Sequence, residues 1–231
     1  MNGARRPSSI VALRAILAKD LRVELRTLQS VPAMALFSLT TFVLFRYGLD
    51  RKSLSGGLAA GVLLATVLFA AILAVNRLFV AERDEGGFDA IRLAPVDGTA
   101  LLGAKAAALV IYLLILEAIA VPNFALFFLD SWSGIPALLG VLVLADLGLA
   151  ATGVLVSSIA ANSRARDLLV PLVLLPLLVP VMIASAAVAQ ELLAAGGPSY
   201  AGVAKWLAVL AIYDMTFAAV GFAVYDYVLE D

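Results

Sequence analysis

The chain has 231 residues, of which 63% are hydrophobic and 14% are charged, and its mean hydropathy is +1.04. Soluble domains carry about a quarter charged residues, so this composition is typical of a polytopic membrane protein. The net charge of −1 does not point to nucleic acid as a partner, and the absence of cysteine and histidine excludes disulfides, thiolate metal sites and histidine- or cysteine-based catalysis.

Residues 1–30 are predicted to form a cytoplasmic segment that contains an amphipathic helix from Ile10 to Leu28. Too many charges interrupt this stretch for it to span a bilayer, and its apolar stripe runs directly into the first apolar segment. The pattern favours a helix that lies at the membrane surface; the alternative is a solvated helix before the first span. The apolar stripe consists of Ile10, Leu13, Leu17, Leu21 and Leu28, and the charged positions are Arg14, Lys19, Asp20, Arg22, Glu24 and Arg26.

Six segments are long and apolar enough to cross a membrane, which takes about 20 apolar residues. Because lipid cannot satisfy an open backbone, each is predicted to be a helix, and the fold class is an all-α membrane protein with six transmembrane helices after an N-terminal interfacial helix. The third segment is too long for one straight crossing and is expected to begin with an interfacial turn or to break near Pro122-Asn123. The predicted transmembrane domain is 31–225, with spans at about 31–49, 54–75, 101–129, 135–160, 168–189 and 201–224, followed by an acidic tail at 226–231.

Basic residues predict the orientation, because Lys and Arg gather on the cytoplasmic side. With the N-terminus in the cytoplasm, twelve basic residues lie on the cytoplasmic side and four on the other, so both termini are predicted to be cytoplasmic. The twelve are Arg5, Arg6, Arg14, Lys19, Arg22, Arg26, Arg77, Arg83, Arg92, Lys105, Arg164 and Arg166, and the four are Arg46, Arg51, Lys52 and Lys205.

One internal stretch, residues 76–95, holds much of the charge between two apolar segments. Its first part continues the second span, Gly86-Gly87 favours a turn, and a short helix around Phe88 ends before Pro95. A short helix with large apolar residues inside a charge cluster is suited to a cleft on another protein. The residues alone leave two interpretations open, partner docking and an ordinary solvated loop.

The run ERDEGGFDAIRLAP, from Glu82 to Pro95, resembles a pattern in permease subunits of ABC exporters, and within them the haem exporter B (CcmB) family. KDLRVELR at Lys19–Arg26 is similar to the opening helix of that family. LVPLVLLPLLVPVMIA at Leu169–Ala184 is similar to its proline-punctuated fifth span and is the most specific match. The departures lie in the charged run, where the family usually has serine or threonine, leucine and glutamate, and they leave only the fine detail of docking in doubt. These departures are Gly87, Phe88 and Asp89.

The resemblance implies the permease subunit of an ABC complex for cytochrome c maturation in the bacterial inner membrane. It implies a cytoplasmic ATPase (CcmA-like), a haem-handling membrane subunit (CcmC-like), a small accessory subunit (CcmD-like) and two permease copies. ATP and haem are then bound by partners, which agrees with the absence of a GxxxxGK[ST] loop from this sequence. The expected ATPase-coupling residues are Glu82, Arg83, Asp84, Glu85, Gly86, Gly87, Phe88, Asp89, Ile91 and Arg92.

Prolines and polar groups inside the spans are further candidates. Pro171, Pro176 and Pro180 fall in one predicted span, and each removes a helical hydrogen bond. They predict a bent helix that forms a gate or lines a cavity; the alternative is that membrane helices simply tolerate proline. The intramembrane polar residues are Glu117, Asn123, Asp146 and Asp214.

The three intramembrane acids are expected to be neutral carboxyls that join helices by hydrogen bonds, and a proton relay or cation site is the alternative. Haem iron usually takes histidine, cysteine, methionine or tyrosine. The chain offers only Met34, Met182 and Met215 within its spans, plus tyrosines near their edges, and without histidine or cysteine it is not expected to ligate haem. Two other functions stay open: an ABC exporter permease for another cargo, such as a lipid-linked saccharide or drug, and a proton-coupled carrier using Glu117 and Asp146.

Overall fold

The computed structural model describes residues 8–49, 51, 53–78, 98–160, 163 and 165–228, with side chains described as far as Ala223. All regular structure in these residues is helical. In chain order the helices are α1 (Ser9–Thr27), α2 (Ser30–Gly48), α3 (Gly56–Arg77), α6 (Gly98–Phe128), α7 (Ile135–Ala160), α8 (Arg166–Leu192) and α9 (Val203–Val228).

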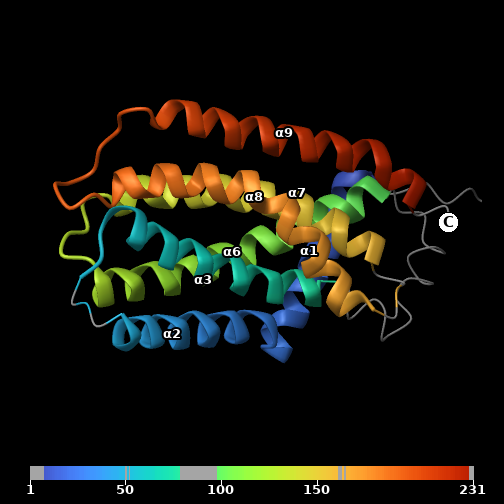
Figure 1. Ribbon diagram of the computed structural model, residues 1–231. Coiled ribbons are helices and arrows are strands. Elements are labelled where there is room, and N and C mark those ends of the chain that lie inside the picture. The colour runs from blue at the N-terminus through green and yellow to red at the C-terminus, as the bar shows by residue number, and fades with distance from the viewer. Residues whose placement is uncertain are drawn as a thin grey trace, which may run out of the picture.

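Within the described residues, six of these helices, α2 to α9, are long and apolar enough to span a membrane, which confirms the predicted all-α class with six spans. They lie side by side, whereas α1 crosses them (Figure 1). The links α2–α3, α6–α7 and α8–α9 lie at one end of the bundle. The last turn of α3, the first turns of α6 and α8, and the C-terminus lie at the other end (Figure 1).

Helix α6 differs from the expectation of a break or an interfacial turn, since it runs unbroken from Gly98 to Phe128 with Pro122 inside it. Proline removes a backbone donor and loosens the turn before it. Beside the proline, Asn123 Nδ2 donates a 2.7 Å hydrogen bond to the carbonyl oxygen of Ile119 in the same helix. One proline removes a single helical hydrogen bond, and membrane helices tolerate that loss.

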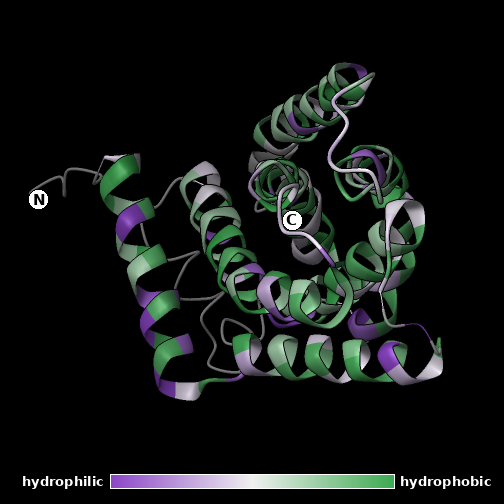
Figure 2. Ribbon diagram, turned by 90° about the vertical axis from the view of Figure 1, so that its left-hand side faces the viewer, coloured by the Kyte–Doolittle hydropathy of each residue, from purple (hydrophilic) through white to green (hydrophobic). Residues whose placement is uncertain are grey.

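The core lies along α3, α6 and α7, and the outer helices face the surroundings. In the most apolar window of α3, 67% of the residues are buried, whereas the figure for α9 is 11%. The outer spans α2, α8 and α9 expose many large apolar side chains, as expected where lipid replaces water. Apolar residues predominate along these helices (Figure 2). At the α2–α6 contact, the Phe42 ring lies 5.6 Å from Phe124 and 6.2 Å from Phe128, between centroids.

Backbone hydrogen bonds join the connecting segments at the end of the bundle away from α1. The amide of Leu54 donates to the Phe128 carbonyl at 2.8 Å, and the amide of Gly56 donates to the Leu193 carbonyl at 2.7 Å. Gly134 approaches the end of α8 so closely that a Cβ atom there would collide with the Leu192 carbonyl. Glycine is therefore required at this position for close contact between backbones.

This contact predicts that Gly134→Ala lowers the free energy of unfolding by about 1–3 kcal/mol, the usual cost of forcing an extra methyl group into a packed contact. Gly140→Ala is the matched control, because a Cβ at Gly140 meets no atom within 4 Å. Thermal unfolding of the detergent-solubilised chain measures both variants. Equal midpoints for Gly134→Ala and Gly140→Ala would contradict the predicted collision.

Candidate functional site

The candidate site is the C-terminal end of α3, from which the chain enters the charged stretch predicted to dock a partner. The last carbonyl groups of any helix have no partner within the helix and need another donor. Here three side chains from three other helices donate to them, and we call these three side chains the polar clamp. Ser157 Oγ of α7 donates to the Val75 carbonyl at 3.2 Å, Lys105 Nζ of α6 to the Leu78 carbonyl at 3.2 Å, and Arg166 Nη2 of α8 to the Asn76 carbonyl.

Lys105 links the clamp to α1. Its side chain is 2% exposed, and its Nζ lies 2.9 Å from the Asp20 Oδ2 of α1 as well as 3.2 Å from the Leu78 carbonyl. The backbone of Asp20 is held separately, since the Tyr112 hydroxyl of α6 donates to its carbonyl at 3.3 Å. One buried ammonium group therefore joins the surface helix, the first turns of α6 and the end of α3.

Arg166 and Ser157 fix the other side of the α3 terminus. Arg166 is the first residue of α8 and is 2% exposed, while Ser157 is fully buried near the end of α7. Helices α7 and α3 approach closely here, because a Cβ on Gly153 would lie 2.9 Å from the Val75 side chain. The positive groups of Arg166 and Lys105 also face the negative end of the α3 dipole, which is a favourable arrangement.

The predicted coupling residues Glu82, Arg83, Asp84, Glu85, Gly86, Gly87, Phe88, Asp89, Ile91 and Arg92 lie outside the described residues. Only the start of the predicted 76–95 stretch, through Leu78, is described. The clamp therefore holds the root of that stretch, and any displacement of the root must change its contacts with α6, α7 and α8.

Two of the predicted intramembrane acids meet in the core. Glu117 of α6 and Asp146 of α7 are each 2% exposed, and their carboxyl groups are neighbours across the contact between the two helices. A hydrogen bond between two carboxyl groups needs a proton on one of them. Asp146 also lines a cavity of about 20 Å³ between α3, α7 and α8, together with Ser185.

The third acid, Asp214, belongs to a different contact, between α9 and α7. It lies against Gly148, where an added Cβ would collide with its Oδ1. The adjacent Tyr213 hydroxyl lies 2.9 Å from Thr152 Oγ1 of α7 and donates to the Leu177 carbonyl of α8 at 3.0 Å. The structure thus brings Glu117 and Asp146 together and places Asp214 separately, at the contact of α9 with α7.

The three predicted prolines all lie within α8, which changes direction along its length (Figure 1). Pro176 and Pro180 are exposed, and Pro171 is half-buried. The α8 residues around the small cavity are instead Leu178, Val181, Met182 and Ser185. The prolines therefore lie toward the outside of the bundle. The Leu177 carbonyl, next to Pro176, accepts a 3.0 Å hydrogen bond from the Tyr213 hydroxyl of α9.

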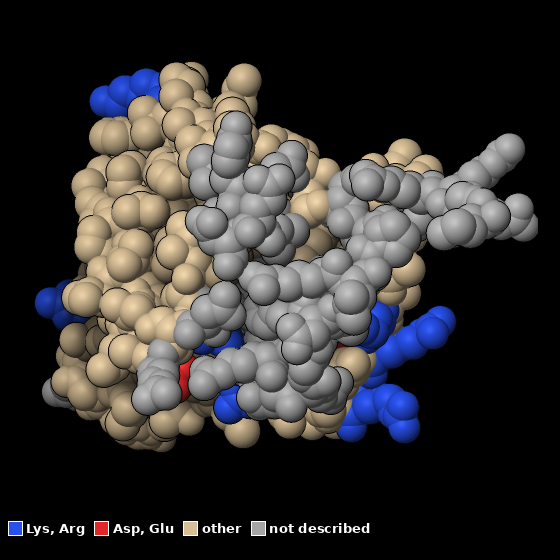
Figure 3. Space-filling model, turned by 90° about the vertical axis from the view of Figure 1, so that its right-hand side faces the viewer, with Lys and Arg blue, Asp and Glu red and all other residues tan. Residues whose placement is uncertain are grey.

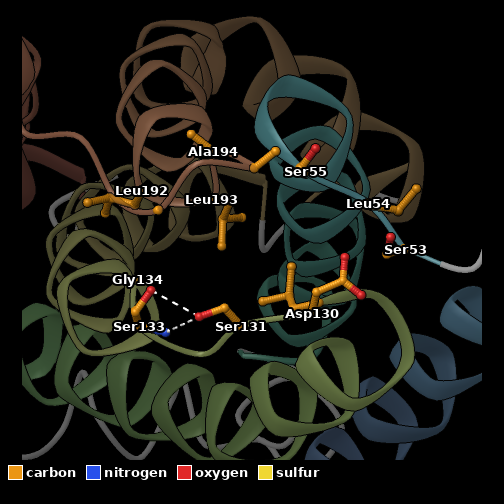
Figure 4. A pocket seen from close by; sticks show the side chains of 13 residues that line it. Ser53, Leu54, Ser55, Asp130, Ser131, Ser133, Gly134, Leu192, Leu193 and Ala194 are labelled. Atoms are coloured by element: carbon orange, nitrogen blue, oxygen red, sulfur yellow. Dashed lines mark hydrogen bonds between the residues drawn. The ribbon is translucent and has the colours of Figure 1, made fainter.

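A larger cavity of about 200 Å³ lies at the end of the bundle opposite the clamp (Figure 4). Its polar lining comes from the link segments, and Ser131 and Ser133 are joined through a 3.1 Å contact between their hydroxyl oxygens. Leu192 and Leu193 close one side (Figure 4). The cavity opens between the three links, so its shape depends on how the spans are arranged at that end.

Sequence reasoning missed the clamp residues as site residues. Lys105 and Arg166 count among the predicted cytoplasmic basic residues, but the structure buries both. A signal does exist: each is a basic residue near the start of an apolar segment, at the end of the bundle where the last carbonyl groups of α3 need donors from outside the helix. Asp20, buried on an otherwise charged surface helix, completes the same set.

Comparisons with known proteins identify the family. The model of the family described as CcmB protein matches residues 11–228. Heme exporter protein B of Rhodobacter capsulatus is 31% identical over 218 residues, covering 91% of this chain and 95% of that protein. The heme exporter protein B of Paracoccus denitrificans is 29% identical over 212 residues, covering 90% and 97%, and that of Bradyrhizobium diazoefficiens is 27% identical over 186 residues, covering 80% and 83%. No solved structure matches the chain.

The burial of Lys105 predicts a measurable coupling with Asp20. Asp20→Asn removes the carboxylate from a buried ammonium group and is expected to lower the free energy of unfolding by about 3 kcal/mol. The double variant Asp20→Asn/Lys105→Met removes both charges and is expected to cost less than the sum of the single changes. Unfolding in detergent measures this cycle, and exposed Asp130→Asn is the control. Strict additivity of the two single changes would show that the ion pair contributes nothing.

Proposed function

Because the chain belongs to the CcmB family, we propose that it is the transmembrane permease subunit of the ABC complex for cytochrome c maturation. The observation that carries this proposal is the match of relatives called heme exporter protein B along almost their whole length. The name of these relatives favours haem over a lipid-linked saccharide or drug as the cargo of the complex. The subunit itself transmits work, and ATP is hydrolysed by a separate partner.

The ATPase partner docks on the stretch after α3, and the polar clamp passes its movement to the spans. The support is the position of the clamp at the root of that stretch. There its side chains join α6, α7 and α8 to the end of α3, and the Lys105–Asp20 pair adds α1. Buried Lys and Arg side chains are costly inside a membrane protein. A displacement that removed their partners would leave buried charges unpaired, so the helices that provide those partners are expected to move together with α3.

The remaining partners follow from the same proposal. The complex contains a CcmA-like ATPase, a CcmC-like haem-handling subunit, a small CcmD-like subunit and two permease copies in the bacterial inner membrane. The clamp end of the bundle faces the cytoplasm, and both termini lie there. The excess of basic residues on that side supports this orientation.

Haem is cargo of the complex, and its iron is held by a partner. The three methionines within the spans lie on three different helices, α2, α8 and α9, and differ in exposure. Met34 is fully buried, Met215 is 72% exposed, and Met182 lines the small apolar cavity. With no histidine or cysteine available, this chain offers no pair of strong axial ligands.

Docking of the ATPase on the stretch after α3 predicts that Phe88→Asp and Asp89→Arg each reduce the amount of ATPase that co-purifies with the chain. The expected reduction is about tenfold, which corresponds to about 1.4 kcal/mol of binding free energy. Charge or bulk introduced at a contact surface opposes binding, whereas the spans should stay folded. Phe88→Leu, which keeps an apolar side chain, and Asp130→Arg, which reverses a charge at the opposite end, are the controls. Undiminished co-purification by both test variants would place the ATPase contact elsewhere.

The proposal also predicts that the intramembrane acids are dispensable for ATP coupling. The chain with Glu117→Gln, Asp146→Asn and Asp214→Asn together keeps neutral hydrogen-bonding groups in the core and is expected to stimulate the partner ATPase as the wild type does. The measurement is ATPase activity of the co-purified complex in lipid. Loss of stimulation with an intact complex would support the rival function, a proton-coupled process that uses these carboxyls.

A further inference from the structure

Helix α1 separates its charges by sign. Its two acidic residues face inward: Asp20 pairs with Lys105, and Glu24 Oε1 accepts hydrogen bonds from the Ser30 and Val31 amides at 2.8 and 2.9 Å. Glu24 thereby caps the start of α2, where a carboxylate is favourable. Both acidic side chains are engaged within the protein and are less than a tenth exposed.

The basic residues of α1 face outward. Arg14, Lys19, Arg22 and Arg26 are all exposed, and the last three recur at helical spacing along one face. Lys19 is also 3.3 Å from Asp20 Oδ1, but half of its side chain stays accessible. Lys and Arg side chains project from the edge of the bundle on the side of α1 (Figure 3), so the outward face of this helix is strongly positive.

Large apolar side chains are exposed beside these bases. Leu25 is 74% exposed, Ile10 66%, Leu28 60% and Val11 58%. Four such residues next to a basic stripe are unfavourable in water but fit the boundary between headgroups and acyl chains. An acidic protein surface would neutralise the bases but leave these side chains without an apolar partner. The combination of exposed bases and exposed apolar side chains favours a lipid surface over an acidic protein surface.

The direction of this face is fixed by the fold. Helix α1 crosses the spans instead of continuing along them (Figure 1), and the Tyr112 hydroxyl and the Lys105 ammonium hold it against α6. Gly103 of α6 allows the contact, because a Cβ there would lie 3.1 Å from Leu13 Cδ1. The basic face is therefore presented at a constant angle to the bundle and does not depend on a free tail.

We propose that α1 binds the headgroups of anionic phospholipids through Arg14, Arg22 and Arg26, with Lys19 at the edge of the site. The exposed leucines and isoleucine insert among the adjoining acyl chains. Each cation near an anionic membrane surface adds to binding, and the attraction is screened by salt. Because Asp20 of α1 pairs with Lys105 of the polar clamp, bound lipid would also hold α1 next to the root of the stretch after α3.

The test is native mass spectrometry of the full chain in neutral detergent, titrated with phosphatidylglycerol or phosphatidylcholine. The wild type is expected to bind phosphatidylglycerol several-fold more tightly, and the triple variant Arg14→Gln/Arg22→Gln/Arg26→Gln is expected to lose that preference. The matched control is Arg51→Gln/Lys205→Gln, which removes exposed bases from the opposite end and should keep it. Far-ultraviolet circular dichroism checks that each variant keeps its helices.

Three outcomes would overturn the proposal. The first is a wild type that binds both lipids equally. The second is a triple variant that keeps its full preference for phosphatidylglycerol at low salt, since the anionic lipid site would then lie elsewhere. The third is a triple variant that keeps the preference but no longer co-purifies with the ATPase, which would assign the basic face of α1 to a protein partner.

Discussion

The buried ammonium group of Lys105 is the constraint on which the arrangement of this end of the bundle depends. A charge that is 2% exposed must keep its partners, and these are the Asp20 carboxylate of α1 and the Leu78 carbonyl at the end of α3. Moving α1 or α3 alone would break one of the two contacts. The surface helix, α6 and α3 are therefore joined where the chain leaves the membrane for the predicted docking stretch.

Polar contacts deeper in the bundle also join helices to one another. Tyr213 joins α9 to α7 and α8, and the Glu117–Asp146 pair joins α6 to α7. In lipid, apolar packing discriminates poorly between one helix contact and another, so such hydrogen bonds help to define a specific arrangement. A bundle whose helices are joined at a few polar points is suited to moving as a unit, as an energy-coupled permease requires.

The sequence predicts the spans well because length and apolar character decide them. The expected spans at 135–160 and 31–49 appear as α7 (Ile135–Ala160) and α2 (Ser30–Gly48). It does not predict the unbroken α6, because a proline inside a long apolar segment is compatible both with a break and with a continuous membrane helix. It also misses the clamp, since a lone lysine near the end of a span is normally expected to reach water, and only the packing of α1 and α3 buries Lys105.

The central claim is that the root of the stretch after α3 transmits the state of the ATPase to the spans. Because the chain has no cysteine, Ala15→Cys on α1 and Leu168→Cys on α8 give a clean pair of spin-label positions. Pulsed electron paramagnetic resonance measures the distance between them in the complex without nucleotide and with ATP trapped on the partner. The account predicts that this distance stays the same in both states of the wild type, because the clamp makes α1 and α8 move together with α3, and that it shifts on trapping ATP in Arg166→Met, where α8 has lost its contact with α3. A shift of equal size in the wild type and in Arg166→Met would contradict it.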